Sequence, residues 1–133
     1  MLTLADIRDY IKSLGVGTNF SIGKIDVNKD ESVGIYQRPN YGNANIAVGG
    51  LETTKTQIKE VSILVHWNKN AKETEAAAQS IFNELLTAEN VTINEQPVSY
   101  IALRMPEPVD VGTDDNGTYE RVIWADFYYQ EEE

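Results

Sequence analysis

The chain has 133 residues, of which 41% are hydrophobic, and a formal net charge of −10 at pH 7. It contains no cysteine, which excludes disulfides, zinc thiolate sites and cysteine nucleophiles. The length predicts a single domain over residues 1–133 that folds without a stabilising metal. No apolar run is long enough to span a membrane, and the acidic start of the chain differs from a secretory signal, so we expect neither membrane association nor export.

The negative charge is concentrated toward the C-terminal end. Residues 1–99 carry 12 acids and 9 bases, a net −3, whereas residues 100–133 carry 9 acids and 2 bases, a net −7. Such a chain is repelled by nucleic-acid phosphates and by anionic lipid, which argues against specific DNA binding. Two interpretations stay open: a solvated acidic rim, or a region that repels anions or receives a cationic partner.

An amphipathic helix is predicted near the N-terminus. Apolar residues recur there at spacings of three and four, which is one face of a helix: Leu4, Ile7, Ile11 and Leu14. Thr3 and Asp6 fit a capping box, and Gly15 or Gly17 suits the C-terminal cap. A short helix with one apolar stripe is expected to dock on a larger element.

Two strands joined as a hairpin are predicted next. Phe20 and Ile22 alternate with polar neighbours, and Val33 and Ile35 alternate again after a polar stretch. The first strand is also expected to continue on its other face through two further residues, Ile25 and Val27. This arrangement predicts antiparallel pairing between the two strands.

The clearest strand follows a long loop. Residues 38–50 are rich in glycine and asparagine and predict a loop with a short extended piece at residues 46–48. Residues 57–67 place β-branched and aromatic side chains at period two, with Leu64 and His66 on the opposite face. Apolar character on both faces predicts a central strand.

A long helix is predicted over residues 71–88. Asn70 is its expected N-cap, with Glu73 as the capping partner. A wide apolar stripe follows at helical spacing: Thr74, Ala77, Ala78, Ile81, Phe82, Leu85 and Leu86. We expect the last four of these to pack on the sheet face that carries Val61, Ile63, Val65 and Trp67.

The C-terminal third predicts a second hairpin, an acidic loop and a long last strand. Val91 and Ile93 lead through a turn into the strand 98–105. Residues 106–118 contain two prolines and three aspartates and predict a loop. Residues 119–129 are apolar on both faces of a strand, so one face is expected to meet the core and the other a partner.

The candidate interaction residues come from these last two segments. Trp124 and Tyr128 lie on the second face of the last strand. Asp110, Asp114 and Asp115 bring three negative charges that suit a basic partner surface or a channel for DNA. The alternative for these aspartates is a solvated hairpin tip.

The elements together predict an α+β fold. We expect a mainly antiparallel, twisted sheet of about five or six strands, with two hairpins and two helices packed on it. No alternation of strand and helix runs through the chain, which argues against a doubly wound parallel sheet.

No motif makes a positive case for catalysis. His66 is the only histidine, and a lone strand histidine is more often structural, although sequence alone leaves a hydrolytic triad open. The glycines of residues 15–17 follow a helix instead of a strand, unlike a dinucleotide loop. Residues 26–37 begin like an EF-hand loop but have Glu31 and Gln37 where glycine and glutamate are needed. We therefore predict no enzyme, no cofactor and no metal site.

Several segments together resemble a phage protein family. They are LADIRDYI (residues 4–11), FSIGK (20–24), VGGL (48–51), LVHWNK (64–69) and PEPVDVG (106–112). These resemble the small "minor capsid" proteins of tailed phages and prophages of Gram-positive bacteria, over nearly the whole chain. The resemblance rests on many short segments in the same order, and it transfers no catalytic residue.

Such proteins are similar to tail terminator and tail completion proteins. The resemblance implies a virion protein, assembled in the host cytoplasm, that forms a homo-oligomeric, hexameric ring on the head-proximal end of the tail tube. Its implied partners are its own copies, the tail tube protein and a head-completion (stopper) protein, with DNA passing through unbound. Two alternatives stay open: a stopper protein at the portal, and a small-molecule enzyme or binding module, which would need a concave pocket.

Overall fold

A computed structural model describes residues 1–39 and 56–130, so the extended piece predicted at residues 46–48 lies outside the described residues. In chain order the elements are α1 (Leu4–Ser13), β1 (Asn19–Ile22), β2 (Ser32–Gln37), β3 (Thr56–His66), α2 (Ala71–Leu86), β4 (Glu89–Ile93), β5 (Gln96–Leu103), β6 (Val109–Thr113) and β7 (Tyr119–Gln130). The strands form one seven-stranded sheet in the order β1-β2-β3-β7-β5-β4, with β6 paired to β7 outside this path.

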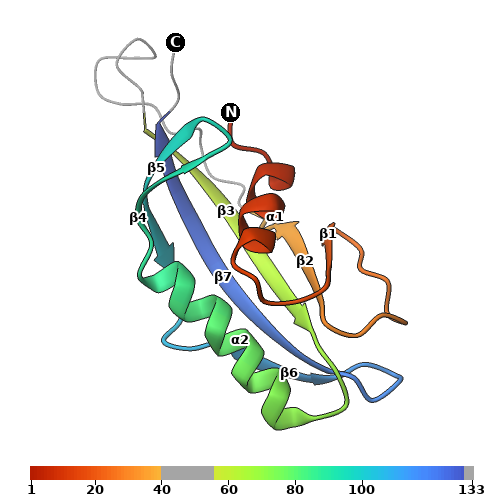
Figure 1. Cartoon of the computed structure of the whole chain (residues 1–133). Coiled ribbons are helices and arrows are strands. Elements are labelled where there is room, and N and C mark those ends of the chain that lie inside the picture. The colour runs from red at the N-terminus through yellow and green to blue at the C-terminus, as the bar shows by residue number, and fades with distance from the viewer. Residues whose placement is uncertain (40–55, 131–133) are drawn as a thin grey trace.

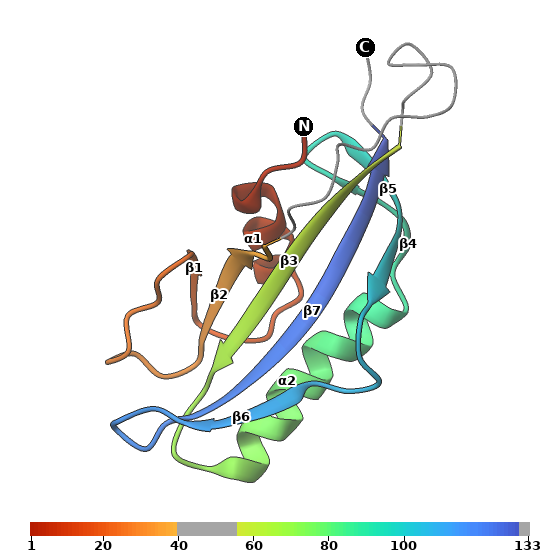
Figure 2. The ribbon, with the colours of Figure 1, turned by 180° about the vertical axis from the view of Figure 1, so that it is seen from behind.

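The predicted α+β fold is confirmed. Both helices lie on one face of the curled sheet, and the view from behind shows the strands in front of them (Figure 1 and Figure 2). Most strand pairs are antiparallel, as predicted, but the sheet is mixed because β1 and β2 run parallel. We call the face without described helices the outer face.

Helix α1 forms as its sequence predicts. The Thr3 side chain accepts a hydrogen bond from the Asp6 amide, and Asp6 Oδ2 accepts from the Thr3 amide at 2.9 Å, which completes the capping box. Gly15 follows the helix in the left-handed conformation that a C-terminal cap favours. Ile7 and Ile11 are buried, so the apolar stripe faces the sheet.

The first predicted hairpin is wrong. β1 pairs with β2 in parallel, with Phe20 opposite Val33 and Ile22 opposite Ile35. Residues 23–31, which we call the crossing segment, therefore return to the start of β1 before β2 begins. Ile25 is buried on this path, and a Cβ on Gly34 of β2 would come within 2.7 Å of its Cγ2 atom. Ile25 is thus an anchor of the crossing segment on the outer face and not a strand residue.

The centre of the sheet is the long antiparallel pair of β3 and β7. All eleven residues of β3 have a partner in β7, from Thr56 opposite Gln130 to His66 opposite Glu120. β3 also pairs with β2, which confirms the central position predicted for it. The residues of both strands that face the helices are fully buried: Val61, Ile63, Val65, Ile123, Ala125 and Phe127.

Helix α2 packs across β7, β5 and β3. Asn70 is its N-cap, as predicted, because its side chain accepts from the Glu73 amide at 3.1 Å. The return bond expected from Glu73 is not made, since the Asn70 amide donates to Asn68 Oδ1 instead. Leu86 is 60% exposed, so its place in the apolar stripe is wrong. It lies about 100° around the helix from buried Leu85, which turns it to solvent.

The second predicted hairpin is confirmed. β4 and β5 are antiparallel, and Val91 lies opposite Val98. Asn94 and Glu95 have φ angles of 46° and 66° and make the tight turn between them. The Asn94 side chain donates to Asp6 Oδ1 at 2.8 Å, which ties this turn to α1.

The prediction that residues 106–118 are all loop is wrong. Residues Val109–Thr113 form β6, which pairs with β7 around a bulge between Asp110 and Gly112. Only residues 114–118, which we call the tip, form the turn. The acidic, proline-rich composition hid the alternation of Val109 and Val111, since the pairing partner lies in a strand that comes later in the chain.

Candidate interaction surface

The outer face of β7 exposes aromatic side chains. Ile123, Ala125 and Phe127 point to the helices, so the alternate residues of the strand point to the outer face. Among these outer residues of β7, Trp124 is 45% exposed. Tyr100, on the neighbouring strand β5, is 49% exposed. Large exposed aromatic residues are enriched at protein interfaces, which makes this face the candidate site.

Tyr128 and Tyr100 form a stacked pair on this surface. Their ring centroids are 4.4 Å apart and their planes differ by 13°. The stack crosses from β7 to β5, where the two residues are paired in register. Burial, reinforced by the neighbouring Tyr100 and the charge of Asp126, raises the pKa of the Tyr128 hydroxyl, so it stays neutral and can donate a hydrogen bond.

A row of charges lies beside the aromatic residues. Asp126 is only 4% exposed, and its Oδ1 accepts from Arg38 Nη2 at 2.7 Å. Arg38 Nη2 also donates to Glu60 at 3.2 Å, and Arg104 Nη1 is 3.6 Å from the second Asp126 oxygen. The guanidinium carbon of Arg38 lies 5.2 Å from the centre of the Trp124 ring, a cation–π contact.

This charged row is locally neutral, in contrast to the chain as a whole. Two arginines face two carboxylates within it, whereas the chain carries −10. Burial of Asp126 is tolerated because the charge is paired. Arg38 Nη1 is buried without a hydrogen-bond partner in the described part of the chain. Both carboxylate contacts of this guanidinium are made by its other terminal nitrogen, Nη2. The outer face therefore combines exposed aromatic rings with charges that are already compensated.

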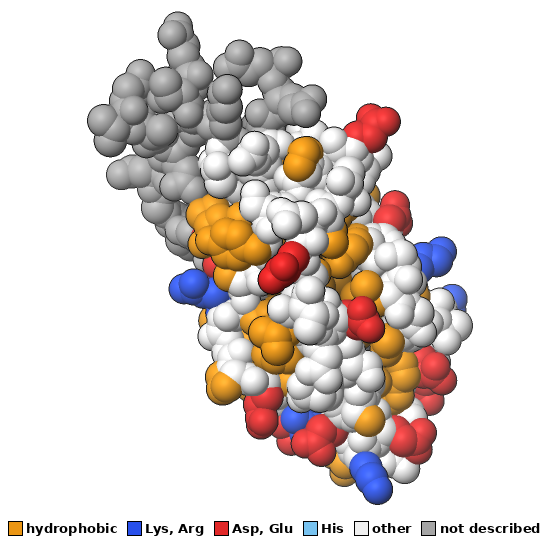
Figure 3. Space-filling model, turned by 60° about the vertical axis from the view of Figure 1, so that its left-hand side comes forward, with side chains coloured by type: hydrophobic (Ala, Val, Ile, Leu, Met, Phe, Trp, Pro, Cys, Tyr) orange, Lys and Arg blue, Asp and Glu red, His pale blue; other side chains and the backbone are white. Residues whose placement is uncertain are grey.

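The surface around this site is uneven in charge. In Figure 3 the hydrophobic side chains form separate patches among polar ones, and acidic side chains are spread over the view but are most frequent toward the lower end, where Figure 1 places β6 and the start of α2. Val109 and Val111 of β6 are about half exposed in this acidic region.

The structure does not bring the three predicted aspartates together as one arm. Asp110 lies 3.8 Å from Arg121, which also lies 3.7 Å from Glu75 of α2. Asp115 is exposed at the tip. Asp114 instead points inward and organises the turn, because its Oδ1 accepts from the amides of Asn116 and Thr118, both at 2.9 Å. Hydrogen bonds from these amides lower the pKa of the Asp114 carboxyl.

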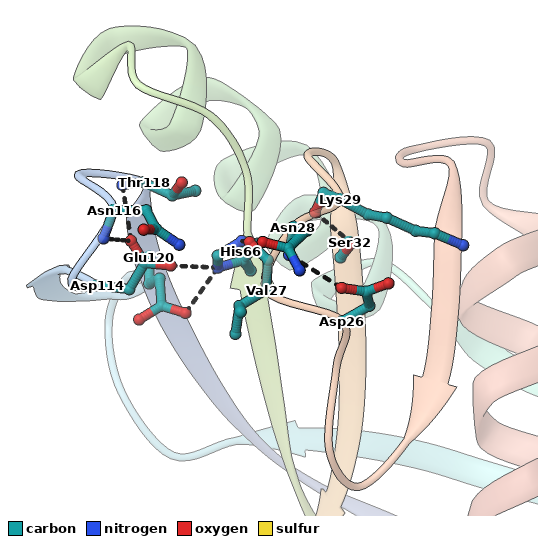
Figure 4. A network of polar contacts seen from close by, with 10 residues as sticks. All are labelled: Asp26, Val27, Asn28, Lys29, Ser32, His66, Asp114, Asn116, Thr118 and Glu120. Carbon is teal, nitrogen blue, oxygen red and sulfur yellow. Dashed lines mark hydrogen bonds and ion pairs between the residues drawn. The ribbon is translucent and has the colours of Figure 1, made fainter.

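A second polar cluster surrounds His66 (Figure 4). The ring is fully buried at the end of β3. Its Nδ1 is 2.9 Å from Glu120 Oε2 and 3.8 Å from Asp114 Oδ2, and its Nε2 is 3.2 Å from the carbonyl oxygen of Val27. Both ring nitrogens are thus occupied, and neither faces a hydroxyl nucleophile, so this geometry does not assemble a hydrolytic triad.

Other enzyme-like features are weak. Within residues 1–39 and 56–130 no group of three or more histidine or acidic side chains is arranged to hold a metal ion. One open groove lies between α1 and β4, away from the outer face, and is lined in part by Asp6, Tyr10 and Asn94. No described helix is both long and apolar enough to cross a membrane.

Trp124 and Tyr128, which the sequence offered as candidate interface residues, lie on the outer face, but their neighbours there were not predicted. Arg38, Tyr100, Arg104 and Asp126 come from three separate segments that meet only in the folded sheet. One sequence signal could have predicted this ion pair. Asp126 lies within an apolar strand, and a buried carboxylate needs a cationic partner.

The protein is a small α+β domain whose outer face exposes aromatic side chains beside paired charges. In a comparison with protein families, residues 2–130 match the model of the family described as bacteriophage tail terminator protein. The chain therefore belongs to the bacteriophage tail terminator family. No curated protein and no solved structure matches the chain.

Proposed function

We propose that this protein is a ring subunit that closes the head-proximal end of a phage tail tube and helps to join tail to head. The observation that carries the proposal is the match to the tail terminator family over residues 2–130. The protein is then a structural component of the virion, and it acts without catalysis.

The outer face is the surface best suited to contact between subunits. A ring needs a contact in which one surface meets a different surface of the next copy, and the rotation must close. Aromatic residues and arginine are the types that contribute most to such contacts. Locally compensated charge at Arg38, Arg104 and Asp126 lets two strongly acidic copies approach there with less repulsion.

The acidic character of the rest of the molecule suits passage of DNA. A lumen lined by carboxylates repels phosphates and does not retain the nucleic acid. The remaining partners in this proposal are the tail tube protein on one side of a hexameric ring and a head-completion (stopper) protein on the other.

A reconstruction of the virion neck by electron microscopy tests the proposal. We expect one closed ring of this chain between the tube and the head. Isolated copies on the capsid shell would contradict the ring, and a ring bound at the portal away from the tube would assign the stopper role instead.

A variant pair links the ring to the outer face. We expect Trp124→Ala to reduce binding to tail tubes and yield of complete virions. Leu86→Ala is the matched control, because Leu86 is also exposed but lies on α2, on the other side of the sheet. Equal losses in both variants would contradict an interface at the outer face.

A further inference from the structure

The contacts of the buried His66 ring fit hydrogen on both ring nitrogens. A carbonyl oxygen only accepts hydrogen bonds, so Nε2 must carry a hydrogen to bond Val27. A carboxylate likewise accepts, so Nδ1 must donate to Glu120. The neutral ring has only one N–H and can satisfy only one of these two acceptors. The arrangement therefore fits the imidazolium cation.

A third group depends on the same cation. Among residues 1–39 and 56–130, Asp114 Oδ2 is buried without a hydrogen-bond partner, and it lies 3.8 Å from Nδ1 of His66. Its other oxygen is already used by two amides of the tip. A buried carboxylate oxygen needs compensation, and the ring cation supplies it at this distance.

These contacts tie together segments that are distant in sequence. Val27 belongs to the crossing segment, Glu120 to the start of β7 and Asp114 to the tip, and Figure 4 shows all three converging on the ring. We propose that protonated His66 is a pH-sensitive clamp that holds the tip and the crossing segment against the end of β3, and that loss of one proton releases them.

The charged and titratable groups around the ring support this proposal. Glu120 of β7 and Asp114 of the tip face the ring directly. Lys69, after β3, interacts with Asp114, and Tyr36 of β2 interacts with Glu120, so both act on the ring through these carboxylates. In the crossing segment, the side chains of Asp26 and Lys29 point away from the ring in Figure 4. Two carboxylates thus face the ring, and the one lysine named here acts on it only through Asp114.

The direction of the pH effect follows from the charge. Contacts made only by the protonated ring are present at low pH and are lost as the pH rises through the titration of His66. The clamp is therefore expected to loosen as the pH rises.

Nuclear magnetic resonance of the full chain tests the protonation state directly. The chain has a single histidine, so its ring nitrogens are assigned without ambiguity. We expect both nitrogens to be protonated at about pH 6 and one to lose its proton by about pH 9. A ring that is already neutral at the lower pH, or that keeps both protons at the higher pH, would overturn the proposal.

Hydrogen exchange tests the release. After correction for intrinsic rates, we expect protection of the Asn28 and Thr118 amides to fall at least about tenfold from about pH 6 to about pH 9. These amides report on the crossing segment and on the tip. Unchanged protection at both sites would overturn the proposal even if the ring titrates.

Two conservative variants separate the clamp from general charge effects. Asp114→Asn keeps the oxygen that accepts from the tip amides but removes the charge that faces His66, so the tip should lose its pH dependence. Asp115→Asn removes the same charge from a neighbouring exposed position and should leave that dependence intact. The same response in both variants would contradict a specific role of the His66–Asp114 contact.

Discussion

The two faces of strand β7 place neighbouring residues in very different environments. Ile123, Ala125 and Phe127 are fully buried beneath the helices, whereas Trp124, one position away, is 45% exposed. The inner residues make apolar contacts that stabilise the fold. Those of the outer face combine exposed rings with paired charges. Under the proposed function, stability and assembly are separated across the two faces of a single strand.

The largest effect is expected from the inner face. Phe127→Ala removes a fully buried ring, and we expect the free energy of unfolding to fall by about 3–5 kcal/mol. Unfolding in denaturant, followed by circular dichroism, measures this loss. A fall of less than about 1 kcal/mol would mean that the inner face is not the tightly packed core.

A smaller effect is expected from the charged row. Arg38→Met leaves Asp126 buried with only the longer contact to Arg104, and we expect a loss of about 1–3 kcal/mol. The double variant that adds Asp126→Asn removes the uncompensated charge and should regain part of this stability. If the double variant is as unstable as the sum of both single changes, the ion pair is not coupled.

The elements that the sequence predicts correctly are those whose signals lie close together in the chain. α1, α2, β3 and β7 were found because their apolar periodicity is local and their caps lie within a few residues. The parallel β1–β2 pair was missed because it depends on Ile25 packing over Gly34, a contact between segments that no local pattern specifies.

The candidate site was harder to predict than the core. Trp124 and Tyr128 stood out as apolar residues on a second strand face, but Arg38 and Asp126 are 88 positions apart and pair only in the folded chain. Asp114 was placed among solvated charges, whereas its place beside His66 is set by the hairpin of β6 and β7. Burial of a polar residue is a property of the whole fold.

The tip provides a pH-dependent test of the role of Asp114 in stability. Hydrogen bonds from the amides of Thr118 and Asn116 lower the pKa of Asp114 in the folded chain. The ionised carboxyl therefore stabilises the fold above its unfolded pKa, and this stabilisation is lost as the pH falls through the lower, folded value. We expect unfolding free energies measured between about pH 5 and about pH 2 to fall less steeply in Asp114→Asn than in the natural chain. Asp115→Asn, at an exposed position, should retain the natural slope.

The smallest effect on stability is expected from Trp124→Ala, and it is the sharpest test of the comparison. The Trp124 ring is 45% exposed and lies against the Arg38 guanidinium, so its loss creates no enclosed cavity. We expect a change in unfolding free energy of less than about 1 kcal/mol, in contrast to Phe127→Ala on the same strand. A variant that unfolds normally but fails to bind tail tubes would assign Trp124 to assembly. If Trp124→Ala destabilises the chain as much as Phe127→Ala, the outer face is a second core face, and the division between the two faces of β7 does not hold.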